Sequence, residues 1–344
     1  MTLLTLFWIW SSAACGLALA MLALLIVYRW LTNRRAQSRR LKRAHYVELL
    51  KAGAEGEVGA SDGTVDILTD LVVEILDLVR GEEKRIFAER VIQAGVTGRL
   101  QRRLESGNVR TRILAASSLA NFADDGSIAA LRGALADRHR QVPLTAALSL
   151  AAIGKAPPTG QLVDKLGIGS EEAPLIVIML LFELARTDLA GVRALLTDQS
   201  IGWSLRTAAA QALARRNDFA SVGAISALAM KAEPSELELA QLLDALARLK
   251  HPEGSKAVLH HLRSPLPTVR AAATRAAGRI GVVPAMDQLE CLLDDPHWAV
   301  RLNAAEALVR FGNEGKTRLA EIAERQDGPR GEMAALTLAE HSRS

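Results

Sequence analysis

Aromatic residues are scarce in this chain of 344 residues, where Phe, Trp and Tyr together make up 4%. No run of alternating apolar and polar residues is long enough to predict a β-strand. Ala and Leu are abundant instead, and both favour helices packed closely on small side chains. The composition therefore predicts an all-α protein.

Cysteine is nearly absent as well: the chain contains only Cys15 and Cys291. Two distant cysteines support neither a disulfide framework nor a metal cluster, and we expect both to be small apolar core residues. Glycine-rich phosphate loops and nucleophile elbows are missing too. The sequence thus predicts a protein that is not an enzyme, without catalytic residues, metal, cofactor or small-molecule substrate.

Acidic residues are missing from residues 1–43, although this segment holds seven basic ones. The remaining 35 Lys and Arg residues stand against 38 Asp and Glu residues in the rest of the chain. The positive net charge therefore belongs to one short segment, and we expect no nucleic-acid partner. The basic residues in residues 1–43 are Arg29, Arg34, Arg35, Arg39, Arg40, Lys42 and Arg43.

A long uncharged stretch precedes these charges and runs over 26 residues from Leu3 to Tyr28. About 20 apolar residues cross a bilayer as a helix, so a single transmembrane helix is predicted over residues 3–30. A cleaved signal peptide would need a basic start, which is lacking. Because all flanking charge follows the helix, the N-terminus should lie outside and the rest in the cytoplasm, at the inner (cytoplasmic) membrane of a bacterium.

Residues 31–64 follow as a basic juxtamembrane segment and a glycine-rich linker. Its charges should contact anionic lipid headgroups. Residues 65–100 carry an amphipathic stripe that predicts divergent capping helices, or alternatively a surface that docks on a partner or the membrane. The predicted membrane-surface residues are Arg34, Arg35, Arg39, Arg40, Lys42 and Arg43.

Residues 101–344 contain an internal repeat of 31–33 residues. Each repeat has an Ala-rich first helix, a turn and a shorter second helix, a hairpin that can bury its apolar face only by stacking on its neighbours. A second apolar series follows the first by three residues and is interrupted only at Arg216. The residues that mark the register are Leu119, Leu150, Leu181, Leu213, Leu246, Ala277 and Leu308.

The segment from Asp294 to Gly312, with an acidic loop, then Val300-Arg301 and an Ala-Ala-x-Ala-Leu run, resembles the HEAT-like repeat family. It is similar in particular to the short bacterial form found in phycobilisome-lyase-type repeat proteins. The resemblance implies a right-handed α-solenoid of about seven hairpins and an Asp–Arg ladder that joins neighbouring units. Pro143 and Pro174 replace the ladder arginine in two units. The predicted ladder residues are Arg112, Arg206, Arg270, Arg301 and Asp295.

Such solenoids generally bind proteins, so we expect a membrane-anchored cytoplasmic scaffold or adaptor whose partner is membrane-associated, for example a polysaccharide glycosyltransferase. A bilin-lyase-like enzyme or chaperone is the alternative that the family resemblance implies. The partner is expected on a concave surface lined by the second helices. The predicted partner-binding residues are Arg132, Lys165, Arg193, His260, His261, Gln288 and Lys316.

Overall fold

A computed structural model describes residues 92, 95–169, 172–231, 233–325 and 328–342, and these residues contain helices and no strand. The prediction of an all-α fold is confirmed for them. The chain divides into two compact units, Met1–Gly107 and Asn108–Ser344. In the first unit the described helix is α4, Val96–Ser106. The second unit holds all the repeats discussed below.

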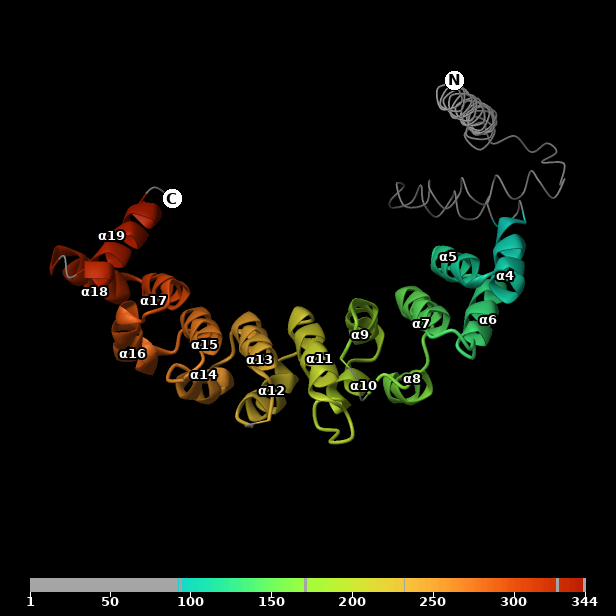
Figure 1. Cartoon of the computed structure of the whole chain (residues 1–344), viewed down its shortest axis with the longest axis horizontal. Helices are drawn as coiled ribbons and strands as arrows, with labels where there is room; N and C mark the ends of the chain where they lie inside the picture. Colours follow the sequence, from blue (N-terminus) through green and yellow to red (C-terminus); the bar gives the residue numbers. More distant parts are fainter. Residues whose placement is uncertain (1–91, 93–94, 170–171, 232, 326–327, 343–344) are drawn as a thin grey trace, which may run out of the picture. The chain divides into compact units, whose positions relative to one another are not determined.

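Helical hairpins follow one another along the second unit, and the first helices of consecutive hairpins contact each other. In Figure 1 they form a continuous row from α5 to α17. The first helices are α5 (Val109–Leu119), α7 (Gln141–Ile153), α9 (Leu175–Thr187), α11 (Trp203–Arg215), α13 (Glu236–Leu249), α15 (Pro267–Ile280) and α17 (Trp298–Arg310). The prediction of about seven hairpins agrees with this row.

The second helices form the other row, and all of them except α18 are shorter than the first helix of the same hairpin. Several adjoin a 3₁₀ turn. They are α6 (Asp125–Ala134), α8 (Thr159–Leu166), α10 (Leu189–Ala194), α12 (Val222–Ala229), α14 (Ser255–His261), α16 (Met286–Cys291) and α18 (Asn313–Arg325). The 3₁₀ turns are η1 (Phe219–Ser221), η2 (Pro252–Gly254), η3 (Val283–Ala285) and η4 (Leu292–Asp294). A last helix, α19 (Gly328–Ser342), packs on α17 and α18.

Small residues set the spacing of the first helices. A Cβ added at Gly278 of α15 would lie 2.6 Å from the Cα of Ala307 in α17, so these helices approach almost backbone to backbone. All seven residues that mark the repeat register, Leu119 to Leu308, are fully or almost fully buried. Burial of this Leu and Ala core supplies the main stabilisation of the stack.

The expected position of the second helices on the concave surface is wrong. Within the second unit, Figure 1 shows the first helices on the inner side of the curve and the second helices on its outer side. The close approach at Gly278 and Ala307 gives the physical reason, because the row with the smaller spacing becomes the shorter, inner row. The first helices therefore line the concave side.

The predicted transmembrane helix, linker and membrane-surface arginines lie outside the described residues. Among the helices that are described, none combines the length and the apolar character needed to cross a bilayer. The expectation of a buried cysteine is wrong for Cys291, which is a free and exposed thiol at the end of α16. Cys15 lies outside the described residues.

Candidate functional site

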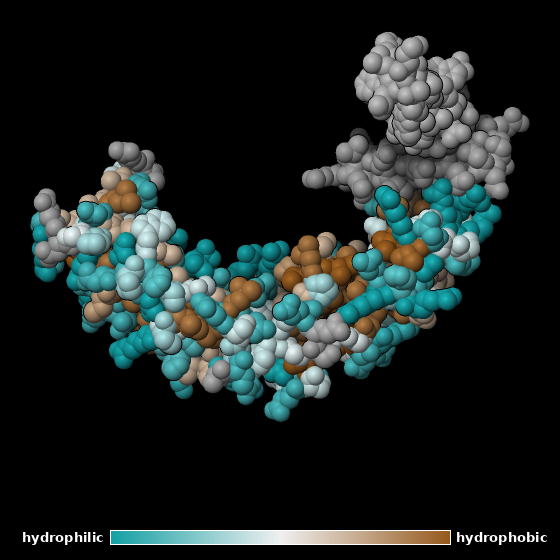
Figure 2. All heavy atoms as spheres, viewed as in Figure 1, coloured by the Kyte–Doolittle hydropathy of each residue, from teal (hydrophilic) through white to brown (hydrophobic). Residues whose placement is uncertain are grey.

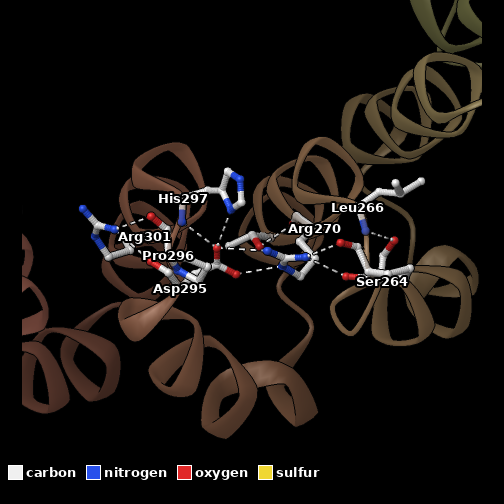
Figure 3. A network of polar contacts seen from close by, with 9 residues as sticks. Ser264, Leu266, Arg270, Asp295, Pro296, His297 and Arg301 are labelled. Carbon is white, nitrogen blue, oxygen red and sulfur yellow. Dashed lines mark hydrogen bonds and ion pairs between the residues drawn. The ribbon is translucent and has the colours of Figure 1, made fainter.

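An ion pair between Arg270 and Asp295 joins the first turn of α15 to the loop that precedes α17 (Figure 3). The Arg270 Nε and Nη2 atoms donate to the two carboxylate oxygens of Asp295 at 2.7 and 3.0 Å. Arg270 Nη1 also donates to the carbonyl oxygens of Ser264 and Pro265, at 2.8 and 3.0 Å. One side chain therefore fixes its own loop and ties it to the next repeat.

Asp295 is almost buried, and its Oδ1 also accepts the backbone N–H of His297 at 2.9 Å. Burial by itself would raise the pKa of Asp295. The hydrogen bonds from Arg270 and from the His297 amide, together with the Arg270 charge, outweigh that effect and hold the pKa below its ordinary value. The carboxylate is thus charged at neutral pH.

The other predicted ladder residues differ in their partners. Arg112 pairs with Asp137 at 2.8 Å, again between neighbouring repeats. Arg301 donates to the carbonyls of Asp295 and Pro296, and the position 25 residues further on, where Arg112 and Arg270 have their aspartates, is Gln326. For Arg206 the position 25 residues further on is Lys231, and the guanidinium lies over the Trp203 ring, 5.0 Å from its centroid. Among the described residues, the structure therefore shows two complete Arg–Asp pairs at the predicted ladder positions.

A large cleft of about 960 Å³ opens between α12, α14 and α16. The carbonyl-bearing loop of Ser264 and Pro265, which Arg270 holds in place, forms part of its wall. Met230 and Leu266 line the cleft and are 38% and 39% exposed. The cleft thus combines a fixed wall with accessible apolar side chains.

Polar groups lie at the floor of this cleft. His261 is buried, and its Nε2 lies 2.7 Å from the carbonyl oxygen of Ala229, so the imidazole donates there. The neighbouring ring of His260 stands edge-on to it, with centroids 4.8 Å apart. At the mouth, Arg263 Nε donates to Gln288 Oε1 at 3.3 Å. These groups can bind polar atoms of a ligand.

Three of the predicted partner-binding residues, His260, His261 and Gln288, come together in this cleft. The adjacent histidines differ in exposure, as neighbours on a helix should, yet both line the same cleft. The remaining four lie on separate second helices and form no common site. Arg193 is paired with Asp218 at 2.7 Å, while Arg132, Lys165 and Lys316 are exposed on α6, α8 and α18.

Met230, Leu266 and the nearby prolines were missed as cleft residues by sequence reasoning, which considered the polar faces of the second helices. Apolar residues in the loops between repeats were the available signal, since loops of a soluble domain are usually polar. A second exposed apolar area lies on α9, where Leu175 and Met179 are 72% and 46% exposed, and brown atoms mark it in Figure 2.

Apolar side chains and hydrogen-bonding groups lie together in this cleft. No group of three or more His, Cys, Asp or Glu side chains that could hold a metal occurs in the part of the chain that the structure describes. His261 donates to a backbone carbonyl rather than to a hydroxyl or thiol. The arrangement suits recognition of another molecule through apolar contacts and hydrogen bonds.

Burial lowers the pKa of His261, and the neighbouring charge of His260 adds to this effect, although the bond to Ala229 opposes it. The unfolded chain binds a proton at this imidazole near pH 6.5, while the folded chain keeps it neutral. Stability is therefore full above pH 6.5 and decreases as the pH falls through that value. We expect His261→Gln, which keeps a donor for Ala229, to show a smaller loss of thermal stability on acidification than the parent protein.

The control for this measurement is His260→Gln, because His260 is exposed. Thermal unfolding followed by circular dichroism between about pH 7.5 and pH 5.5 compares the three proteins. An equal pH dependence of the parent protein and His261→Gln would contradict the assignment.

Comparison with known proteins agrees with this architecture. Residues 224–308 match the family model of HEAT repeats. Comparison with curated protein sequences gives no match. Among solved structures, the crystal structure of Kap121p bound to RanGTP has a TM-score of 0.50 at 12% identity, over 88% of this chain and 38% of the other.

Kap121p bound to Pho4p gives a TM-score of 0.48 at 13% identity, over 88% of this chain and 39% of that one. An engineered protein gives 0.36 at 18% identity, with 81% of each chain covered. The chain spans less than two fifths of the length of the Kap121p structures it matches. At these identities the likeness concerns the fold alone. Together with the family match, it identifies residues 224–308 as HEAT-like repeats within a helical solenoid.

Proposed function

We propose that this protein is a scaffold that binds a protein partner through its repeats while its N-terminal residues hold it at the membrane. The observation that carries the proposal is the cleft between α12, α14 and α16, where Met230 and Leu266 are exposed beside a loop fixed by Arg270. Partly exposed apolar side chains surrounded by polar groups are typical of protein interfaces.

The membrane part of the proposal rests on the sequence. The uncharged stretch from Leu3 to Tyr28 is long enough to span a bilayer, and the arginines that follow favour a cytoplasmic position for the repeats. Those arginines and Lys42 contact anionic headgroups. A single helix would confine the cleft to the membrane surface, so the partner is a membrane-associated protein, such as a membrane-bound enzyme.

The function is binding rather than catalysis, and this too is our proposal. The cleft wall is held by an ion pair whose two members, Arg270 and Asp295, are occupied with each other and with backbone groups. At its floor the His261 imidazole is likewise engaged, with the carbonyl oxygen of Ala229. Such groups can support a surface but offer no activated nucleophile.

Purification of the full-length protein from a mild detergent extract tests the proposal. Leu266→Asp should lower recovery of a stoichiometric partner at least about tenfold, because a charge would replace an apolar contact at the interface. The substitution should leave the fold intact, since Leu266 is the N-cap residue of α15 and Asp is favoured at that position.

The matched control is Leu336→Asp on α19, where the leucine is 49% exposed and lies outside the cleft. Recovery of the partner should be unchanged by this variant. Absence of a stoichiometric partner with the parent protein, or equal recovery with Leu266→Asp, would contradict the proposal.

A further inference from the structure

Four consecutive first helices carry an arginine at the same register position, two residues after the buried residue that marks each repeat. The arginines are Arg215 on α11, Arg248 on α13, Arg279 on α15 and Arg310 on α17. The equivalent residues are Asn121, just after the end of α5, Ala152 on α7 and Glu183 on α9. The series is therefore confined to one part of the stack, the ends of adjacent helices at the turns of the hairpins.

Three of these arginines share one open cleft of about 390 Å³, separate from the cleft described above. Arg248, Arg279 and Arg310 line it together with Lys250, and we call this set the arginine cleft. No Asp or Glu is among the residues that line it. The four residues make the arginine cleft a local concentration of positive charge.

Close packing of α15 on α17 brings the charges together. A Cβ at Gly278 would lie 3.3 Å from Cδ of Arg310, so the stem of Arg310 crosses to α15 beside Arg279. Arg215, at the end of the series, lies over the ring of Phe182 on α9, 4.2 Å from its centroid. The series therefore ends against α9.

The cleft arginines differ from the others on these helices in lacking partners. Arg275 on α15 is paired with Asp244 at 2.7 Å, and Arg270 on the same helix is paired with Asp295 at 2.7 Å. By contrast, the side chains of Arg248, Arg279 and Arg310 form no ion pair or hydrogen bond with any described residue. The guanidinium groups are thus free to bind a ligand.

A purely structural role explains only part of this arrangement. One cation at the end of a helix is stabilised by the helix dipole by about 0.3–1 kcal/mol. Several cations in one cleft repel each other, and a bound anion would relieve that repulsion. Guanidinium groups bind carboxylates in bidentate fashion, which gives geometric selectivity as well as charge.

We infer that the arginine cleft binds an acidic peptide segment of the partner protein, an inference that rests on the proposed scaffold function. Neighbouring packed helices lie about 8–10 Å apart. A polyproline II segment rises about 3.1 Å per residue with three residues per turn, so every third side chain returns to the same face about 9 Å further on. Carboxylates at every third residue therefore match arginines on successive helices.

A peptide fits this surface better than a nucleic acid does. The series of arginines stops at α9, where Glu183 occupies the equivalent position. The phosphate backbone of a longer nucleic acid would therefore meet a negative charge there. Beyond residue 43 the chain has slightly more acidic than basic residues, and this charge balance disfavours the binding of extended polyanions. A short acidic segment can bind within the arginine cleft alone, without reaching Glu183.

The test uses the full-length protein in detergent micelles and a fluorescent peptide of four Glu-Pro-Pro repeats, with anisotropy as the readout. The parent protein should bind this peptide, and binding should weaken as salt rises. Arg279→Gln with Arg310→Gln should raise the Kd at least about tenfold, because two of the cleft charges are removed. Circular dichroism checks that the variant is folded.

The controls are a Lys-Pro-Pro peptide, a peptide with glutamate at every second residue, and Arg138→Gln with Lys155→Gln, two exposed cations outside the arginine cleft. Weaker binding of both control peptides and full binding by the control variant are expected. The inference is overturned if the parent protein does not bind the Glu-Pro-Pro peptide, if both double variants lose the same affinity, or if a single-stranded oligonucleotide binds the cleft more tightly.

Recovery of the partner separates this inference from the proposed function. If Arg279→Gln with Arg310→Gln still recovers the partner in full, while Leu266→Asp does not, the scaffold function stands and the acidic-segment inference fails. Loss of partner recovery with the arginine variant, together with loss of peptide binding, supports both.

Discussion

Asp295→Ala should lower the free energy of unfolding by about 3 kcal/mol, which is the scale for removing one partner of a largely buried ion pair. The Asp295 side chain is 4% exposed and that of Arg270 13% exposed. The substitution leaves the Arg270 guanidinium without its carboxylate, and it removes the acceptor for the His297 N–H. The midpoint of urea unfolding of the full chain in mild detergent measures the effect.

The matched control for this prediction is Asp287→Ala. Asp287 also accepts from an arginine, Arg318, but the Asp287 side chain is 93% exposed, and Arg318 keeps Glu290 and Glu314 as partners. Little change in the midpoint is expected, as for most surface ion pairs. Equal effects of the two substitutions would show that the loop contact between repeats does not stabilise the stack.

Gly278→Ala should destabilise the protein by about 1–3 kcal/mol, although alanine is the better helix former by about 1 kcal/mol. The added Cβ would lie 2.6 Å from the Cα and 2.8 Å from the Cβ of Ala307, so α15 and α17 must move apart. Backbone atoms cannot swing aside as a flexible side chain would. Amide hydrogen exchange should therefore rise in both helices, and the unfolding midpoint should fall.

Gly133→Ala, the same substitution in another helix, should have the opposite effect on the free energy of unfolding. Gly133 lies in α6, and a Cβ there would meet no atom within 4 Å. The loss of backbone freedom in the unfolded chain should stabilise this variant by about 0.5–1 kcal/mol. Stabilisation by both substitutions would contradict the close approach of α15 and α17.

The register of the repeats could be predicted from the sequence because a buried position must recur once per hairpin. Leu119 and Leu308 mark the two ends of that series, and both are buried. The Arg270–Asp295 pair was also within reach, since the acidic loop residue precedes a Val-Arg step. The ladder role predicted for Arg206 has no such pair in the described residues, because the position that corresponds to Asp295 is Lys231.

The curvature of the stack could not be predicted, because it depends on the difference in spacing between two rows of helices. That difference comes from contacts such as Gly278 on Ala307. The bond between His261 and the Ala229 carbonyl, 32 residues away, could not be predicted either, because no sequence motif marks it. The arginine series recurs with the period of the repeat, so it could be predicted from the sequence, although the partners and exposure of its members could not.

The central claim, a membrane-held scaffold that binds its partner through the cleft, is tested most directly by site-specific photo-crosslinking in intact cells. A photoreactive residue replaces Met230 in the cleft, and in a matched protein it replaces exposed Leu336. Both are also made without residues 3–30. We predict one dominant crosslinked protein from position 230, in the membrane fraction, which is absent from position 336 and greatly reduced without residues 3–30. The same crosslinks from both positions, or an unchanged crosslink after that deletion, would contradict the account.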